Sequence, residues 1–175
     1  MSESLPLPAR LVRGVGHAAS WLILVMVLIT FLVVLLRYGF NLGWIWLQES
    51  VTYLHAAVFM LAAAWTWQED SHVRVDILYR GRSRRHRAWV NLIGTLLFLA
   101  PVCVYLLVIG WDYVAASWSL REGSRQAGGL PLVYLLKSLI LALPLLLLIQ
   151  AACEIPGYLR ALRRAAEPVS PAAPS

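Results

Sequence analysis

The chain has 175 residues, of which 60% are hydrophobic and only 14% are charged, and its formal net charge is +6. A soluble domain of this length would need many more polar residues to cover its surface, so the composition predicts a membrane protein. The basic charge does not indicate nucleic-acid binding, because the arginines cluster beside apolar segments, as they do at the cytoplasmic flanks of membrane helices.

The first predicted membrane span is residues 18–36, a run of 19 residues without a charged side chain. At 1.5 Å per residue, a helix of this length crosses roughly 30 Å of hydrocarbon. Arg10 and Arg13 precede it. A secretory signal is the alternative interpretation, but Arg37 and Tyr38 follow where a signal would carry small residues for cleavage. We therefore predict a retained helix.

The second predicted span is residues 44–67, and it is less uniformly apolar because it contains Gln48 and Glu49. Tryptophans stand near both of its ends, as aromatic side chains do at the two interfaces of a membrane. They are Trp44, Trp46, Trp65 and Trp67. Residues 38–47 could instead form a separate interfacial helix along the membrane surface, and the sequence leaves the start of this span open.

Residues 88–111 form the third predicted span and residues 132–153 the fourth. Pro101 lies near the centre of the third span, where we expect it to kink the helix. The final residues, 166–175, are rich in Pro, Ala and Ser and are expected to form a disordered tail. Residues 1–165 are therefore predicted to form a single membrane domain.

The distribution of arginines predicts how the four spans are oriented. Six arginines lie between the second and third spans, and others precede the first span and follow the fourth. The two remaining connections are nearly neutral. Because short cytoplasmic loops carry the excess of Lys and Arg, we predict an all-α integral membrane protein with four transmembrane helices and both termini in the cytoplasm.

Glu49 is the acidic residue placed nearest the interior of the predicted bilayer, where an ionisable group is costly and is usually paired or functional. In the four-span arrangement, Glu49 and Lys137 lie at similar depths from the same membrane face. They are candidates for an intramembrane ion pair, with Arg37 as a competing partner. We interpret such a pair as a structural link between helices in preference to a transport site.

A short polar motif, Asp70, His72 and Asp76, follows the second span in the predicted cytoplasmic loop. His72 and Asp76 would be neighbours on a short helix, and both residue types can ligate metals. The surrounding arginines disfavour a cation, so a hydrogen bond that orders the loop is the simpler interpretation. A haem site between paired histidines is also disfavoured, because no second histidine lies at the same membrane depth as His55. We expect no catalytic residue, no cofactor and no metal.

The order of several motifs resembles the small membrane (Q) subunit of TRAP transporters, the tripartite ATP-independent periplasmic transporters. The resemblance covers Ala18 to Arg160. The motifs that carry it are RYGFN at 37–41, Trp46 with Glu49, DSHVRVD at 70–76, Trp118 with Glu122 and Ser124, and GGLPLVYLLKS at 128–138. One departure is Gln48 before Glu49, where many members of the family have two adjacent acidic residues.

The resemblance implies a role that depends on partners, in the bacterial inner (cytoplasmic) membrane. In this family a large membrane subunit holds the sodium and substrate sites, and a periplasmic substrate-binding protein captures the substrate, typically an organic acid. The small subunit braces the large one. The resemblance thus implies uptake of a carboxylate or keto acid, and Trp118, Arg121 and Arg125 would touch the binding protein. Membrane lipid is the other expected partner.

Two other functions stay open at this point. An autonomous small proton-coupled exporter could use Glu49, although a glutamate with that role would sit nearer the middle of the membrane. A membrane anchor subunit of a redox enzyme would need the pair of histidines that the chain lacks at matching depth. Stable association with a large sodium-dependent permease would separate the family role from both alternatives.

Overall fold

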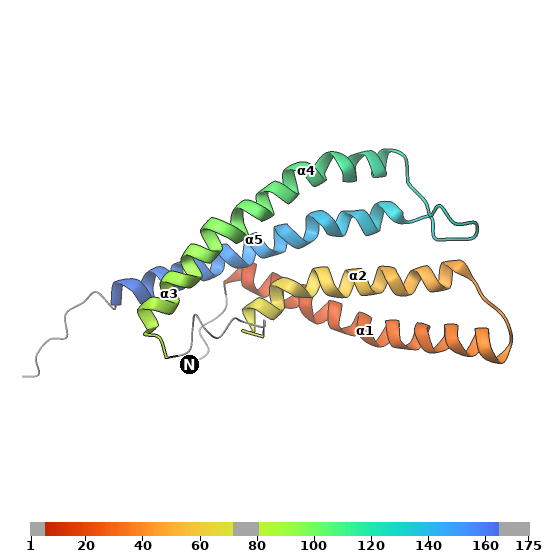
Figure 1. The fold of residues 1–175 in the computed structure, drawn as a ribbon, viewed down its shortest axis with the longest axis horizontal. Helices are drawn as coiled ribbons and strands as arrows, with labels where there is room; N and C mark the ends of the chain where they lie inside the picture. The colour runs from red at the N-terminus through yellow and green to blue at the C-terminus, as the bar shows by residue number, and fades with distance from the viewer. Residues whose placement is uncertain (1–5, 72–80, 165–175) are drawn as a thin grey trace, which may run out of the picture.

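The computed structural model describes residues 6–71 and 81–164, and the regular structure within these residues is entirely helical. The elements in chain order are α1 (Leu7–Gly39), α2 (Ile45–Gln68), α3 (Arg84–Ile93), the π-helical turn η2 (Gly94–Leu99), α4 (Ala100–Ser119) and α5 (Val133–Arg164). Since α3, η2 and α4 follow one another without a break, the described chain forms four helices that run alternately up and down (Figure 1). The all-helical prediction is confirmed.

The two ends of this bundle carry different connections (Figure 1). Residues 40–44 join α1 to α2, and residues 120–132 join α4 to α5, at the end that we call the loop end. The start of α1, the end of α2, the start of α3 and the end of α5 lie at the opposite end, which we call the terminal end. Which of the two ends faces the cytoplasm stays a prediction from the arginine distribution.

Among the described residues, three helices are long and apolar enough to cross a membrane. They are α1, the continuous helix Arg84–Ser119 and α5, with 33, 36 and 32 residues. Helix α2 falls outside this group, and its sequence contains Gln48, Glu49 and His55 among its apolar residues. Its 24 residues still reach roughly 36 Å. The membrane character of the chain is thus supported by three helices, and a fourth crossing by α2 stays a prediction.

The alternative of a separate interfacial helix over residues 38–47 is wrong. Helix α1 continues to Gly39 and α2 begins at Ile45, so only a short turn separates them. Asn41 has a φ of 52°, a left-handed conformation that asparagine adopts more readily than most residues. The Leu42 amide then donates to the Leu36 carbonyl at 2.9 Å. The chain therefore reverses direction at once instead of running along the surface.

Pro101, which was expected to kink the third span, is accommodated by a change of helix type. Proline has no amide hydrogen, and its ring clashes with the carbonyl group four residues earlier in a regular α-helix. The wider π-helical turn Gly94–Leu99 lies immediately before α4, which carries the proline in its first turn. Such turns occur where the regular ladder of hydrogen bonds is interrupted.

Helices α1, α2 and α5 meet in a small core on the side of the terminal end. Val12, Ala64 and Leu146 are buried there. Gly16 allows α1 to approach α2 closely, because a Cβ atom at this position would overlap the side chain of Trp65. Small residues permit this kind of backbone approach between membrane helices, where packing replaces the hydrophobic effect as the source of association.

The outer surfaces of α1 and α4 are apolar and exposed. Large side chains of this kind include Trp21, Leu24, Leu28 and Phe31 on α1, and Val104, Tyr105, Val108 and Ile109 on α4. Contiguous apolar surface of this extent suits contact with lipid or with another membrane subunit.

Candidate functional site

The loop between α4 and α5 begins with a Schellman motif. Helix α4 ends at Ser119, and Arg121 has a left-handed φ of 44°. The Arg121 amide donates to the Trp118 carbonyl at 3.2 Å, and the Glu122 amide donates to the Ser117 carbonyl at 3.0 Å. These two hydrogen bonds define this helix ending. The motif places Glu122 beside the last turn of α4.

Glu122 forms an ion pair there with Lys137, which lies in the second turn of α5. The Oε2 atom of Glu122 also accepts a hydrogen bond from Ser117 Oγ at 2.8 Å. Lys137 Nζ lies 4.0 Å from the centroid of the Tyr113 ring, a cation–π contact. The hydrogen bonds from Lys137 and then from Ser117 lower the pKa of the Glu122 carboxyl, so the carboxylate is ionised at neutral pH. The pair joins the end of α4 to the start of α5.

Glu49, in the second turn of α2, is bound by the same loop. Its two carboxylate oxygens accept hydrogen bonds from Ser124 Oγ and from the Leu130 amide, the latter at 2.7 Å. The Ser124 amide donates to the Leu130 carbonyl at 2.9 Å, which holds the two donors side by side. Gly129 leaves the necessary space, because a Cβ atom there would overlap Ser124 and would lie 2.8 Å from Glu49 Oε2.

The two carboxylates line one cavity of about 460 Å³ at the loop end. The side chains around it come from α2, α4, α5 and the loop, and include Tyr53, Arg125 and Lys137. The buried Tyr53 hydroxyl has no hydrogen-bond partner within the part of the chain that the structure describes. Both carboxylates are bound by groups of this same chain, so the arrangement suits a junction between helices better than an open binding site.

In the structure, the partner of Lys137 is Glu122 and not Glu49, the partner predicted from the sequence. Glu49 and Lys137 do line the same cavity, but Lys137 is paired with Glu122, which the loop carries to it. Arg37, the competing partner, is exposed in the last turn of α1. From the sequence, Glu122 is named only as part of the motif with Trp118 and Ser124, not as a partner of Lys137. The usable signal was the helical hairpin, which brings the residues just after α4 level with the second turn of α5.

Of the polar motif after α2, only Asp70 lies within the described residues, and His72 and Asp76 fall outside them. Asp70 has a φ of 56° and its amide donates to the Trp67 carbonyl at 3.0 Å, so it is the left-handed residue that ends α2. Within residues 6–71 and 81–164, no three His, Cys, Asp or Glu side chains gather closely enough to hold a metal ion. The hydrogen bond between His72 and Asp76 stays a prediction.

The residues predicted to dock a soluble protein lie together at the loop end. Trp118 is 49% exposed, its Nε1 atom donates to Ser138 Oγ at 2.8 Å, and its ring lies 4.8 Å from the ring of Tyr134. Arg121 and Arg125 are exposed. One face of the tryptophan is thus fixed against α5 while both arginines project from the loop, and their docking role stays a prediction.

Comparison with known proteins relates the chain to one family. Residues 26–161 match the family described as tripartite ATP-independent periplasmic transporters, DctQ component. The chain is 30% identical over 88 residues to the C4-dicarboxylate TRAP transporter small permease protein DctQ of Vibrio cholerae, an alignment that covers 50% of this chain and 38% of the relative. It is 33% identical over 85 residues to a protein of Haemophilus influenzae with a provisional assignment as a TRAP transporter small permease protein, covering 49% of this chain and 52% of the relative.

These two alignments therefore span about half of the Haemophilus protein and less than half of the Vibrio protein. No solved structure matches the chain.

Proposed function

The chain belongs to the DctQ family of small permease subunits of TRAP transporters, and on this premise we propose that it braces the large membrane subunit of such a transporter. The family match reaches into all four helices. We place the protein in the bacterial inner (cytoplasmic) membrane. The complete transporter takes up an organic acid, a carboxylate or keto acid, which a periplasmic binding protein delivers and a sodium gradient drives.

The proposal rests on one observation, that both carboxylates at the loop end are bound by other groups of this chain. Glu49 is bound by Ser124 and Leu130, and Glu122 is paired with Lys137. Carboxylates engaged in this way hold α2, α4 and α5 together, and they are not free to bind sodium. The same engagement disfavours proton-coupled export through Glu49, because a transport carboxyl group must exchange its proton with water during the cycle.

The large subunit would contact the apolar outer surface of α1 or α4. Membrane helices associate through close packing and a few polar contacts, since lipid tails are as apolar as the helices themselves. A brace therefore needs a shape that is already fixed before the partner arrives. The polar junction at the loop end supports such a shape, because it ties the α4–α5 hairpin to the start of α2.

Reconstitution in vesicles tests this division of labour. This chain alone should move no labelled organic acid under a sodium gradient. Uptake should begin when the large subunit and the loaded binding protein are added, and omission of this chain should abolish it. The variant Glu49→Gln should lower the yield of the purified complex. Uptake by this chain alone would overturn the bracing role.

Docking of the binding protein is tested by charge reversal at the loop end. Arg121→Glu combined with Arg125→Glu should slow uptake most when the binding protein is scarce, because exposed charges act mainly on the rate of association. Arg82→Glu combined with Arg85→Glu is the matched control, since it makes the same change of charge on exposed residues at the terminal end. Unchanged kinetics in the first variant would reject the docking role and leave the bracing role intact.

A further inference from the structure

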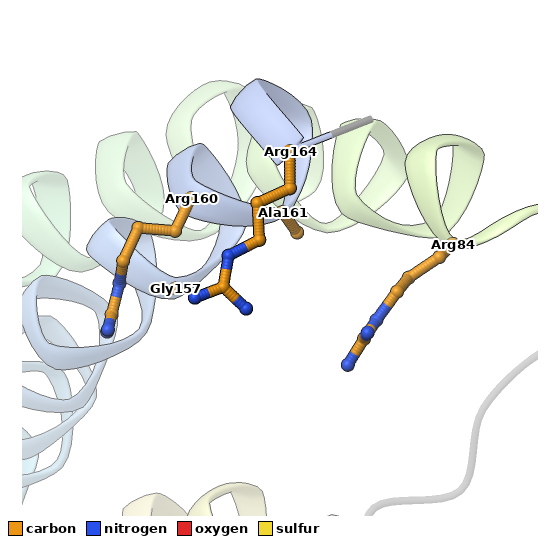
Figure 2. Close-up of a pocket in the computed structure, with 5 residues that line it drawn as sticks. All are labelled: Arg84, Gly157, Arg160, Ala161 and Arg164. Carbon is orange, nitrogen blue, oxygen red and sulfur yellow. The ribbon is translucent and has the colours of Figure 1, made fainter. Parts of the chain in front are cut away.

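A second cavity, of about 390 Å³, lies at the terminal end between the start of α3 and the end of α5. It is lined by three arginines and two small residues, namely Arg84, Arg160, Arg164, Gly157 and Ala161. The three arginine side chains extend to the same side of the two helices (Figure 2). Gly157 and Ala161 carry almost no side chain, so the surface between the guanidinium groups stays open.

The positive charge of this cavity is not neutralised by the described part of the chain. Arg160 Nε donates to the Pro156 carbonyl at 3.2 Å, a local hydrogen bond that leaves its charge unpaired. No carboxylate within residues 6–71 and 81–164 forms an ion pair with any of the three arginines. Helix α3 begins here, and its first turn contains no acidic residue, so the positive end of the helix dipole adds to the same field.

The position of the cavity along the helices indicates what would fill it. Arg84 begins the helix Arg84–Ser119, and Arg164 ends α5, and both helices are candidate membrane spans. Because both helices are long and apolar enough to cross a membrane, we expect the polar ends that line the cavity to lie outside the hydrocarbon, on the side of the lipid headgroups. Trp89 and Leu159 are exposed nearby in sequence, at 47% and 42%, and suit contact with the upper part of acyl chains.

We propose that this cavity binds the phosphate headgroup of an anionic phospholipid, with Arg84, Arg160 and Arg164 as its ligands. Guanidinium groups bind phosphate oxygens in a bidentate manner, and basic pockets between membrane helices are suited to anionic headgroups. The bound phosphate would also offset the mutual repulsion of three like charges brought together by α3 and α5. This lipid site is separate from the bracing role and holds whether or not that role is correct.

The experiment measures binding of phosphatidylglycerol to the purified full chain in phosphatidylcholine nanodiscs. The wild type should bind it saturably, and its melting temperature should rise with the lipid. The triple variant Arg84→Gln, Arg160→Gln, Arg164→Gln should bind at least about tenfold more weakly and should lose the rise in melting temperature. If the triple variant does not fold, Arg164→Gln alone should weaken binding measurably, and unchanged affinity in that variant overturns the site.

A matched control separates a defined site from general attraction to a basic surface. The triple variant Arg82→Gln, Arg85→Gln, Arg87→Gln removes the same charge from exposed positions at the same end of the molecule. It should keep wild-type affinity, and equal weakening in both triple variants would overturn the site. Inorganic phosphate should not displace the lipid at matched concentrations. Displacement by phosphate alone would show a free-anion site and would overturn the lipid assignment.

Discussion

Adding one methyl group at Gly16 should weaken the contact between α1 and α2. Gly16 is buried, and a Cβ atom there would overlap the Cβ and Cγ atoms of Trp65 and would lie 2.6 Å from its Cδ2 atom. Carbon atoms in good contact are about 3.5–4.0 Å apart, so the helices would have to separate by about 1 Å. Trp65 is held in place, since its ring lies 4.9 Å from that of His17 and its Nε1 donates to Glu69 at 3.3 Å.

The expected loss follows from two opposing contributions. Forcing an extra carbon into a packed contact costs about 1–3 kcal/mol. Replacing glycine by alanine inside a helix contributes about 0.5–1 kcal/mol in the other direction, because alanine loses less backbone entropy on folding. The net destabilisation at Gly16 is then about 1 kcal/mol, which lowers the ratio of folded to unfolded protein about fivefold.

Gly14 supplies the control, because it lies in the same helix and an added Cβ there meets nothing within 4 Å. We would unfold the purified full chain with increasing SDS and follow the fluorescence of its eight tryptophans. Gly14→Ala should be as stable as the wild type or slightly more stable, and Gly16→Ala should unfold at lower SDS. Trp65→Ala removes the overlapping Cγ and Cδ2 atoms, so it should cost less stability in the Gly16→Ala background than in the wild type. Equal midpoints for the two alanine variants would refute the close approach of α1 and α2.

The loop end and the orientation of the bundle provide three further tests. The hydrogen bond from Lys137 lowers the pKa of Glu122 below its usual 4.5, so the carboxylate stabilises the fold above that pH, and this stabilisation is lost as the pH falls through the lowered pKa. On acidification, the melting temperature of Glu122→Gln should therefore fall less than that of the wild type. Equal falls in the two proteins would exclude this contribution. Gly129→Ala should destabilise the fold by about 1–3 kcal/mol and lower the melting temperature, because the added Cβ atom would overlap Ser124. Gly43→Ala is the control, since an added Cβ atom there meets nothing within 4 Å, and it should leave the melting temperature unchanged. Equal melting temperatures for the two variants would contradict the tight packing around Gly129. A reporter fused within residues 120–132 should read as periplasmic, and a cytoplasmic signal there would exclude the predicted orientation.

Hydropathy located the helices because long apolar runs and polar breaks are the strongest signal in a membrane protein. It did not locate their ends. Helix α5 continues to Arg164, beyond the predicted limit at residue 153, since backbone hydrogen bonding does not stop at the edge of the hydrocarbon. The tight turn between α1 and α2 was not predicted, for a different reason. Asn41 takes the left-handed conformation there, and neither proline nor hydropathy marks the reversal.

At the candidate site, the sequence predicts the depth of a residue in the membrane but not the partner of its side chain. The distance of a residue from the end of an apolar run predicts its depth in the membrane, and Glu49 and Lys137 do reach the same cavity. Depth does not determine which side chain is in contact, because that depends on the rotation of each helix and on the path of the loop. The path depends on a Schellman motif with Arg121, not glycine, in the left-handed position. The predicted hairpin indicates that the residues just after α4 lie near Lys137, but no sequence pattern marks the turn that selects Glu122 among them.

Under the proposed function, the location of the polar contacts has a consequence for assembly. The junction at the loop end fixes α2 against the α4–α5 hairpin, and Arg13 lies 3.4 Å from Glu69 between α1 and α2 at the other end. The apolar surfaces of α1 and α4 between these ends remain available to a partner. Substitutions at the junction should therefore reduce the stability of this chain on its own. Substitutions on the outer surfaces should change the stability of the isolated chain little and should weaken mainly the complex, because those side chains are largely exposed within the bundle.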